Sequence, residues 1–207
     1  GFGNTMAASS GFLFVSSTTC IDQQGCVFVY HHVSINGTSK ASLTESWSLL
    51  NMLYASNGYP YDNFGTSIAL SSDGTQALIG APSTNRSDVL TKSGTTYMFE
   101  IKTSGVWVQT AILVSHNLSS DASSNGEYDG CGASVAFAND NDGAFVGAAF
   151  TNEAEGAVYY FGNLDSYRVK TGTSSTSKGS AYSSHESNAY RKSSTIDLTL
   201  LLGVAIP

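Results

Sequence analysis

Charge is the scarcest property of this sequence. Asp, Glu, Lys and Arg together make up 12% of its 207 residues, whereas a typical soluble domain has roughly 25%. Only nine residues are Lys or Arg, they are scattered along the chain, and the net charge is −7. Because phosphate binding requires clustered cations, this balance argues against a nucleic-acid partner. No stretch approaches the roughly 20 apolar residues of a membrane span, so we expect none.

The sequence also lacks the patterns of an active site. It contains no nucleophile elbow, paired carboxylates, metal-ligand spacing or phosphate-binding loop. Residues 65–67 (Gly-Thr-Ser) and 132–134 (Gly-Ala-Ser) superficially suggest a catalytic serine, but both occupy the same place in a repeat, which indicates a structural role. His116 and His185 lie in polar segments without an identifiable Ser or Cys partner. We therefore expect a protein that is not an enzyme.

What the sequence does contain is a repeated hairpin, clearest at residues 61–82. Residues 67–70 alternate in polarity, residues 72–74 (Ser-Asp-Gly) have turn chemistry, and residues 77–79 are apolar. Gly80 and Pro82 then end the run. The pattern predicts two short antiparallel strands joined by a tight turn.

The same hairpin occurs twice more. Phe2-Gly3 and Cys131-Gly132 stand where Phe64-Gly65 stands, so the glycine recurs after 62 and then 67 residues. Downstream, we align residues 12–17 and 144–149 with residues 77–82. Three copies in register predict a repeat architecture.

Each unit continues into a third strand, and two units into a fourth. The third strands are residues 27–30, 96–99 and 158–161, which follow Gly25, Gly94 and Gly156 respectively. Trp47 and Trp107 mark fourth strands that close the first two units. The third unit has no such strand in the expected place.

These motifs resemble the FG-GAP repeat, the blade of the integrin-α-type β-propeller, and more closely its short-loop extracellular variant. The resemblance rests on Phe64-Gly65, on residues 80–82 (Gly-Ala-Pro), on the two tryptophan strands and on their weaker copies. It implies an all-β fold of three FG-GAP-like antiparallel β-propeller blades, forming an open or partial propeller with an extended C-terminal tail. Propellers usually close with four to eight blades, so three leave two bare faces.

The predicted organisation has three parts. Residues 1–163 form the blades, at about 2–60, 61–120 and 128–163. Residues 164–195 are a Ser/Thr-rich spacer whose composition cannot bury enough apolar surface to fold alone. Residues 196–207 are an apolar C-terminal strand or arm, which we expect to dock, from about Thr195 to Ile206, on the open edge of the third unit. Donation to a neighbouring subunit is the preferred mode.

The three cysteines are the one clue to the redox environment. Cys20 and Cys26 bracket a five-residue loop between two strands, and we expect a disulfide there. Cys131 takes the repeat position of the aromatic Phe64, so a buried thiol is favoured over an intermolecular bridge. The chain begins at Gly1 without an apolar leader, as a processed secreted protein would.

Candidate modification and metal sites lie in predicted loops. Asn36, Asn85 and Asn117 begin N-glycosylation sequons, and we expect glycans on them. Asp140 and Asp142 lie in an acidic turn whose equivalent in integrin-like blades can bind calcium, but the loop is short and a simple Asp-Gly turn is favoured. No cofactor is expected. His31 and His32 are adjacent on a strand, so they point to opposite faces and do not chelate one ion.

Together these features predict a non-enzymatic extracellular structural glycoprotein. It would assemble with copies of itself, head to tail, into a fibre or surface layer, because an open arc leaves apolar faces that need partners. The alternative is a cell-adhesion or ligand-binding ectodomain of integrin-like β-propeller type. Fold resemblance alone does not decide between them.

Overall fold

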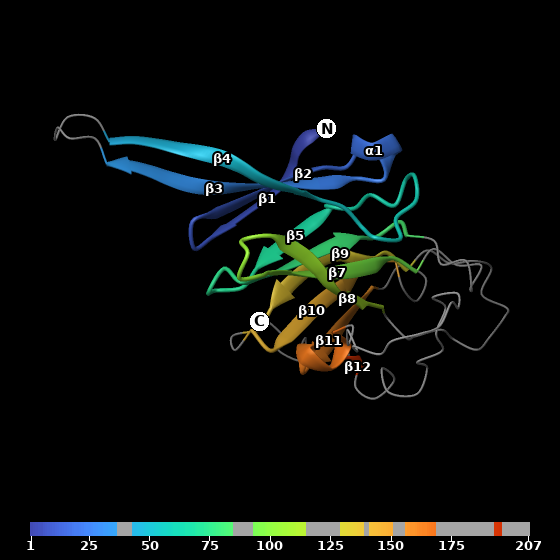
Figure 1. Cartoon of the computed structure of the whole chain (residues 1–207). Helices are drawn as coiled ribbons and strands as arrows, with labels where there is room; N and C mark the ends of the chain where they lie inside the picture. The colour runs from blue at the N-terminus through green and yellow to red at the C-terminus, as the bar shows by residue number, and fades with distance from the viewer. Residues whose placement is uncertain are drawn as a thin grey trace, which may run out of the picture.

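The described part of the chain folds into three antiparallel sheets of four strands each (Figure 1). The computed structural model describes residues 1–36, 43–84, 93–114, 129–138, 141–150, 156–168 and 193–195. Sheet 1 contains β1 (Phe2–Ser9), β2 (Phe12–Ser17), β3 (Cys26–Asn36) and β4 (Leu43–Leu53). Sheet 2 contains β5 (Ser67–Leu70), β6 (Gln76–Ala81), β7 (Thr95–Ile101) and β8 (Trp107–Leu113). Sheet 3 contains β9 (Cys131–Phe137), β10 (Gly143–Ala148), β11 (Ala157–Gly162) and β12 (Ser193–Thr195).

Helix is limited, within the described residues, to two four-residue segments. These are α1 (Cys20–Gln23), in the β2–β3 loop, and the 3-10 turn η1 (Leu164–Tyr167), after sheet 3. The all-β class predicted from the repeat is therefore confirmed, as is its division into antiparallel sheets.

The turn between β5 and β6 has the geometry that its sequence predicts. Asp73 accepts hydrogen bonds from Ser71 Oγ (2.6 Å) and from the Thr75 backbone N–H (3.0 Å). These bonds, with Ser71 the largest contributor, hold the pKa of Asp73 below its ordinary value. Gly74 adopts a φ of +70°, which a residue without a Cβ accommodates without strain. Local side-chain chemistry thus fixes the register of the hairpin.

The register of sheet 1 corrects one alignment made from sequence. Met6, Ile68 and Val135 are equivalent, because each lies three positions after the first-strand glycine of its sheet. Their partners on the second strand are Val15 in sheet 1, Ile79 in sheet 2 and Val146 in sheet 3. Ser16 therefore corresponds to Gly80, and residues 12–17 are shifted by one relative to the predicted match with residues 77–82. The error has a physical consequence, since a slip of one residue moves each side chain to the opposite face.

The fourth strand of sheet 3 comes from far along the chain. β12 pairs antiparallel with β11, joining Tyr159 to Thr195 and Phe161 to Ser193. The third unit thus gains a fourth strand at the predicted open edge, within the same molecule, but the strand comes from Ser193–Thr195, the end of the predicted spacer, and not from the apolar residues 196–207. Residues 196–207 lie outside the described residues.

Two hydrophobic cores hold the three sheets in a row, with sheet 2 in the middle (Figure 1). The first core, between sheets 1 and 2, includes Phe14, Val29, Phe64, Ile79 and Tyr97. The second core, between sheets 2 and 3, includes Leu78, Met98, Cys131, Val146 and Tyr159. Ile79 and Leu78 are neighbours on β6 that enter different cores, so both faces of sheet 2 are covered.

Ion pairs add a tie between sheet 2 and the segment after sheet 3. Glu100 of β7 is 8% exposed and pairs with Lys102 Nζ at 3.0 Å and with the guanidinium of Arg168. Arg168 also pairs with Asp165 of η1 at 2.8 Å. A largely buried carboxylate requires such partners, because an unpaired buried charge is costly.

Candidate interaction surface

The junction between sheets 1 and 2 is built on Phe64 and Gly65. Phe64 is fully buried, and its N–H donates to the Gln24 carbonyl at 2.9 Å. Gly25 packs so closely on the Phe64 backbone that a Cβ there would lie 2.7 Å from the Phe64 nitrogen. Gly65 has a φ of +90°, and a Cβ on it would lie 2.7 Å from Ser16 Cβ. Backbone packs on backbone at this junction, so only glycine fits.

The junction between sheets 2 and 3 repeats this arrangement with other residues. Cys131 is fully buried, and its N–H donates to the Ser93 carbonyl at 3.0 Å. A Cβ on Gly94 would lie 2.5 Å from the Cys131 nitrogen. Gly132 has a φ of +93°, and a Cβ on it would lie 3.2 Å from Gly80 Cα. The two junctions therefore share one geometry.

A hydroxyl group completes each junction. Thr5 Oγ1 donates to the Thr66 carbonyl at 2.7 Å in the first junction. Ser67 Oγ donates to the Gly132 carbonyl at 2.8 Å in the second. Thr5 and Ser67 are equivalent, because each lies two residues after the first-strand glycine of its sheet. Ser67 thus has a structural role, as predicted from its recurrence in the repeat.

These contacts define two features of every sheet. We call the residue pair 2–3, 64–65 or 131–132 the inserting pair of its sheet. In sheets 1 and 2, the receiving site is the set of residues that contact the inserting pair of the next sheet. In sheet 3, the receiving site is the set of residues at the equivalent repeat positions. The receiving sites are Thr5, Ser16 and Gly25 in sheet 1, Ser67, Gly80 and Gly94 in sheet 2, and Ser134, Gly147 and Gly156 in sheet 3.

Sheet 1 has an inserting pair that enters no other sheet of the described structure. Phe2 is 62% exposed, whereas Phe64 and Cys131 at the same repeat position are fully buried. A Cβ placed on Gly3 would meet no atom within 4 Å. The Phe2 ring lies against its own sheet, with its centroid 5.3 Å from that of Phe28 on β3.

The rest of that outer face is apolar as well. The register places Met6, Val15, Phe28 and Met52 in one row across the four strands. Trp47 and Leu49 of β4 continue the same face, opposite His32 and Tyr30 respectively. The large side chains with high exposure on this face are Met6 (64%), Trp47 (47%), Leu49 (55%) and Met52 (45%). A contiguous apolar face of this kind marks an interaction site more often than an ordinary surface.

Sheet 3 has the complementary feature at the other end of the row. Ser134 and Ala136 are exposed on its outer face, while the equivalent Ser67 is buried under sheet 3. Phe145 and Tyr160 are half-buried beside them, with ring centroids 5.0 Å apart. The exposed residues named on the two outer faces carry no charge, and the one acidic residue that the register adds to the outer face of sheet 1 is Glu45, opposite Ser34 near the far end of β4.

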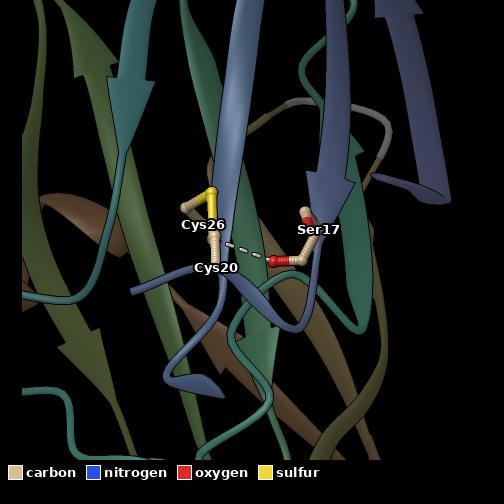
Figure 2. Close-up of a disulfide and its surroundings, with 3 residues drawn as sticks. All are labelled: Ser17, Cys20 and Cys26. Carbon is tan, nitrogen blue, oxygen red and sulfur yellow. Dashed lines mark hydrogen bonds between the residues drawn. A yellow bond between two sulfur atoms is a disulfide. The ribbon is translucent and has the colours of Figure 1, made fainter. Parts of the chain in front are cut away.

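The predicted disulfide is present between Cys20 and Cys26, which close the loop around α1 (Figure 2). Cys20 Sγ lies 3.0 Å from the Ser17 carbonyl oxygen, a contact shown by the dashed line in Figure 2. Cys131 is buried in the second core, where it fills the aromatic position of the repeat. A thiol at that depth is not accessible for an intermolecular bridge.

The other predicted site residues are distributed over the chain. His31 contacts Phe12 and His32 contacts Trp47, on opposite faces of β3, as the alternation of a strand requires. Asp142 is exposed, and its carbonyl accepts a hydrogen bond from Leu164 N–H at 3.0 Å. Among the residues that the structure describes, no three His, Cys, Asp or Glu side chains gather as a metal site would require.

Several predicted sites fall outside this description. Asn36 ends β3, but its side chain is not among the described groups, and Asn85, Asn117 and Asp140 lie outside the described residues. The glycosylation sites and the calcium candidate therefore stay predictions.

Sequence reasoning missed the receiving sites. The sequence pattern identifies Ser67 and Ser134 only as serines in a repeated motif, and Gly80 only as the end of a strand. The signal was present in the sequence, since Ser67 and Ser134 follow the repeat glycine at equal spacing. The sequence does not show that the backbone of the neighbouring sheet approaches these residues closely.

Neither helical segment of the described residues has the length and apolar character of a membrane span.

Comparison with known families agrees with this geometry. No curated protein matches the chain significantly. Residues 47–99 match the model of the FG-GAP repeat. That segment runs from β4 into β7 and contains both the inserting pair at residues 64–65 and the receiving glycine Gly80. The chain therefore contains an FG-GAP repeat at residues 47–99.

Proposed function

We propose that this protein is a non-enzymatic extracellular structural glycoprotein that assembles head to tail into a fibre or surface layer. In this proposal the three sheets are blades of an open propeller, and the outer face of sheet 1 packs on the outer face of sheet 3 of the next copy. One observation carries the proposal, namely the apolar outer face of sheet 1, which exposes Phe2, Met6 and Leu49 at 55% or more.

Head-to-tail contact follows from the difference between the two ends. The faces of sheet 2 are covered by two different neighbours, so the repeat already uses one face to receive and the other to insert. A contact between unlike surfaces produces a ring if the rotation closes, and an open filament if it does not. The disulfide and the FG-GAP repeat both favour an extracellular setting.

The C-terminal segment strengthens the assembly in this proposal. β12 brings the chain to the edge of sheet 3, and the apolar residues 196–207 follow directly. We propose that this segment docks on a neighbouring subunit, where an added strand gains main-chain hydrogen bonds. Deleting residues 196–207, which keeps β12 intact, should then give soluble protein that no longer assembles, and unchanged assembly would contradict the donated segment.

A second candidate function has its own supporting observation. Three tyrosines in the 54–61 loop are strongly exposed, Tyr54 (53%), Tyr59 (61%) and Tyr61 (63%), and Gln23 Nε2 donates to the Tyr61 hydroxyl at 3.2 Å. Aromatic side chains with a polar tip are common at binding surfaces. A cell-adhesion or ligand-binding ectodomain would use such a loop.

Negative-stain electron microscopy of protein secreted by a eukaryotic host tests the main proposal. We expect regular fibres or sheets, and an intact mass above the 21.7 kDa of the bare polypeptide because of glycans on Asn36, Asn85 and Asn117. Dispersed particles of protomer size would contradict assembly and favour the ectodomain. A mass equal to the bare polypeptide would contradict glycosylation.

A further inference from the structure

We infer that the inserting pair of sheet 1, Phe2 and Gly3, enters the receiving site of sheet 3 in a second copy of this chain. The receiving residues are Ser134, Gly147 and Gly156. This inference rests on the proposed head-to-tail assembly and names the contact that forms it. The template is internal, because the chain makes the same contact twice within itself.

The inserting pair is already in the conformation that the contact requires. Gly3 has a φ of +85°, close to the +90° of Gly65 and the +93° of Gly132. At Gly65 and Gly132 a side chain would collide with the neighbouring sheet, whereas nothing lies within 4 Å of the equivalent point at Gly3. The backbone bend is thus present where no neighbouring sheet is. Association at a preformed surface loses less conformational entropy than association that must order it.

The receiving site is preformed as well. Gly147 holds the place of Gly80, pairing with Ser134 as Gly80 pairs with Ser67. Gly156 has a φ of +79°, between the +97° of Gly25 and the +72° of Gly94. A Cβ on Gly156 would have no described atom closer than 3.6 Å, the distance to the carbonyl oxygens of Ala148 and Ala149 in the preceding segment. The space that Phe64 and Cys131 occupy at the other two glycines is therefore not taken by described residues here.

Ser134 supplies the hydroxyl of this third contact. Its equivalents, Thr5 and Ser67, each donate to a backbone carbonyl of the inserted strand at 2.7 and 2.8 Å. Ser134 is exposed and lies at the same position of β9. In the assembled state it donates to the carbonyl of Gly3 or of the following residue in the next copy. Phe2 becomes buried, as Phe64 is.

Alternatives within the chain explain these features less well. Among the described residues nothing packs on Gly3, so within sheet 1 its left-handed φ accompanies only the irregular register of β1 between Phe2 and Met6. A like-with-like contact between two sheet 1 faces would leave Gly147 and Gly156 unused. Contact with a copy of the same chain uses all five residues at once.

Two variants that block opposite ends test the inference. Phe2→Asp places a charge on the inserting pair, and Ser134→Lys fills the receiving site with a long charged side chain. Thr103→Lys is the matched control, because it adds the same charge on the exposed turn between β7 and β8. Each variant is checked for folding by its urea midpoint, and Ser134→Ala, which removes only the hydroxyl, is included as a mild variant.

Light scattering after gel filtration then gives the molar mass of each sample. We expect each end-blocked variant alone to be a monomer, and an equimolar mixture of the two to form a dimer that stops there. In that dimer the intact Phe2 of the Ser134→Lys chain meets the intact site of the Phe2→Asp chain. Thr103→Lys should assemble like the unmodified chain, and Ser134→Ala should assemble several-fold more weakly.

The possible failures separate the inference from the proposed function. If the unmodified chain is monomeric, both are wrong. If it assembles and Ser134→Lys assembles equally well, the named contact is wrong while self-assembly stands. If both variants are monomeric and their mixture stays monomeric, the two ends do not meet each other and the inference is wrong.

Discussion

Phe64 and Phe2 occupy the same repeat position, and replacing each by alanine should have opposite consequences for folding and for assembly. Phe64 is fully buried, with its ring centroid 5.5 Å from that of Tyr97 and 6.0 Å from that of Phe99. Truncating a buried phenylalanine costs about 3–5 kcal/mol of stability. That is a large part of the roughly 5–15 kcal/mol of a typical domain. Phe64→Ala should therefore be severely destabilised or unfolded.

Phe2→Ala should barely change the stability of the monomer. Phe2 is 62% exposed, and its one ring contact among the described residues is with Phe28. The loss should be about 1 kcal/mol or less, since most of the side chain is already in water. Assembly should weaken by at least about tenfold, because burial of the ring is then lost from the contact.

Urea unfolding in the Ser134→Lys background measures the first effect without a contribution from assembly. Sedimentation of the two alanine variants with an unmodified Ser134 measures the second. If Phe2→Ala costs the monomer as much as Phe64→Ala, Phe2 is already part of a closed core. If Phe2→Ala assembles normally, the ring does not contribute to the contact, and the reasoning from repeat position fails.

The remaining predictions concern the fold. Gly80→Ala should lower the free energy of unfolding in urea by about 1–3 kcal/mol, because the new Cβ would overlap the Gly132 carbonyl. An unchanged free energy of unfolding would mean that the two sheets are loosely packed at this junction. Replacing Cys20 and Cys26 by serine should cost about 2 kcal/mol, as expected for the entropy of so short a loop, and no loss would show that the bridge does not constrain the unfolded chain. The lowered pKa of Asp73 means that its contribution to stability is present above about pH 4 and is lost as pH falls through the lowered pKa. Asp73→Ala should lose less stability as the pH falls below about 4. An identical fall in the free energy of unfolding in both proteins would contradict this prediction.

Much of the fold is predictable from sequence because its signals are local. The Ser-Asp-Gly turn at residues 72–74 and the glycines before each third strand encode geometry that neighbouring residues enforce. The pairing of Cys20 with Cys26 follows from their short separation. These signals locate the strands without any information on how the sheets pack.

The alignment at residues 12–17 failed for a different reason. Val15 and Ser16 are both plausible equivalents of a small or apolar strand residue, and the deciding fact is which of them faces sheet 2. Ser16 does, against Gly65. The sequence carries no Gly-Ala-Pro element in sheet 1 to fix the register, so only the tertiary contact distinguishes the two.

The receiving sites are even harder to predict from sequence. Ser134 and Gly147 do not stand out in a chain rich in serine and glycine. Their role is recognised only from the equivalent residues Ser67 and Gly80, which contact the neighbouring sheet. Likewise, the predicted open edge of sheet 3 was correct in place, but the pairing of β12 with β11 depends on a long-range return of the chain.

Sedimentation velocity of the intact secreted chain, over a wide range of concentrations, tests the central claim most directly. Head-to-tail contact predicts a distribution that shifts to larger species as concentration rises, because each added copy leaves one inserting pair and one receiving site open. A closed ring would give one discrete multiple of the protomer mass. A single species of protomer mass at every concentration would contradict the claim that the outer faces of sheets 1 and 3 bind each other.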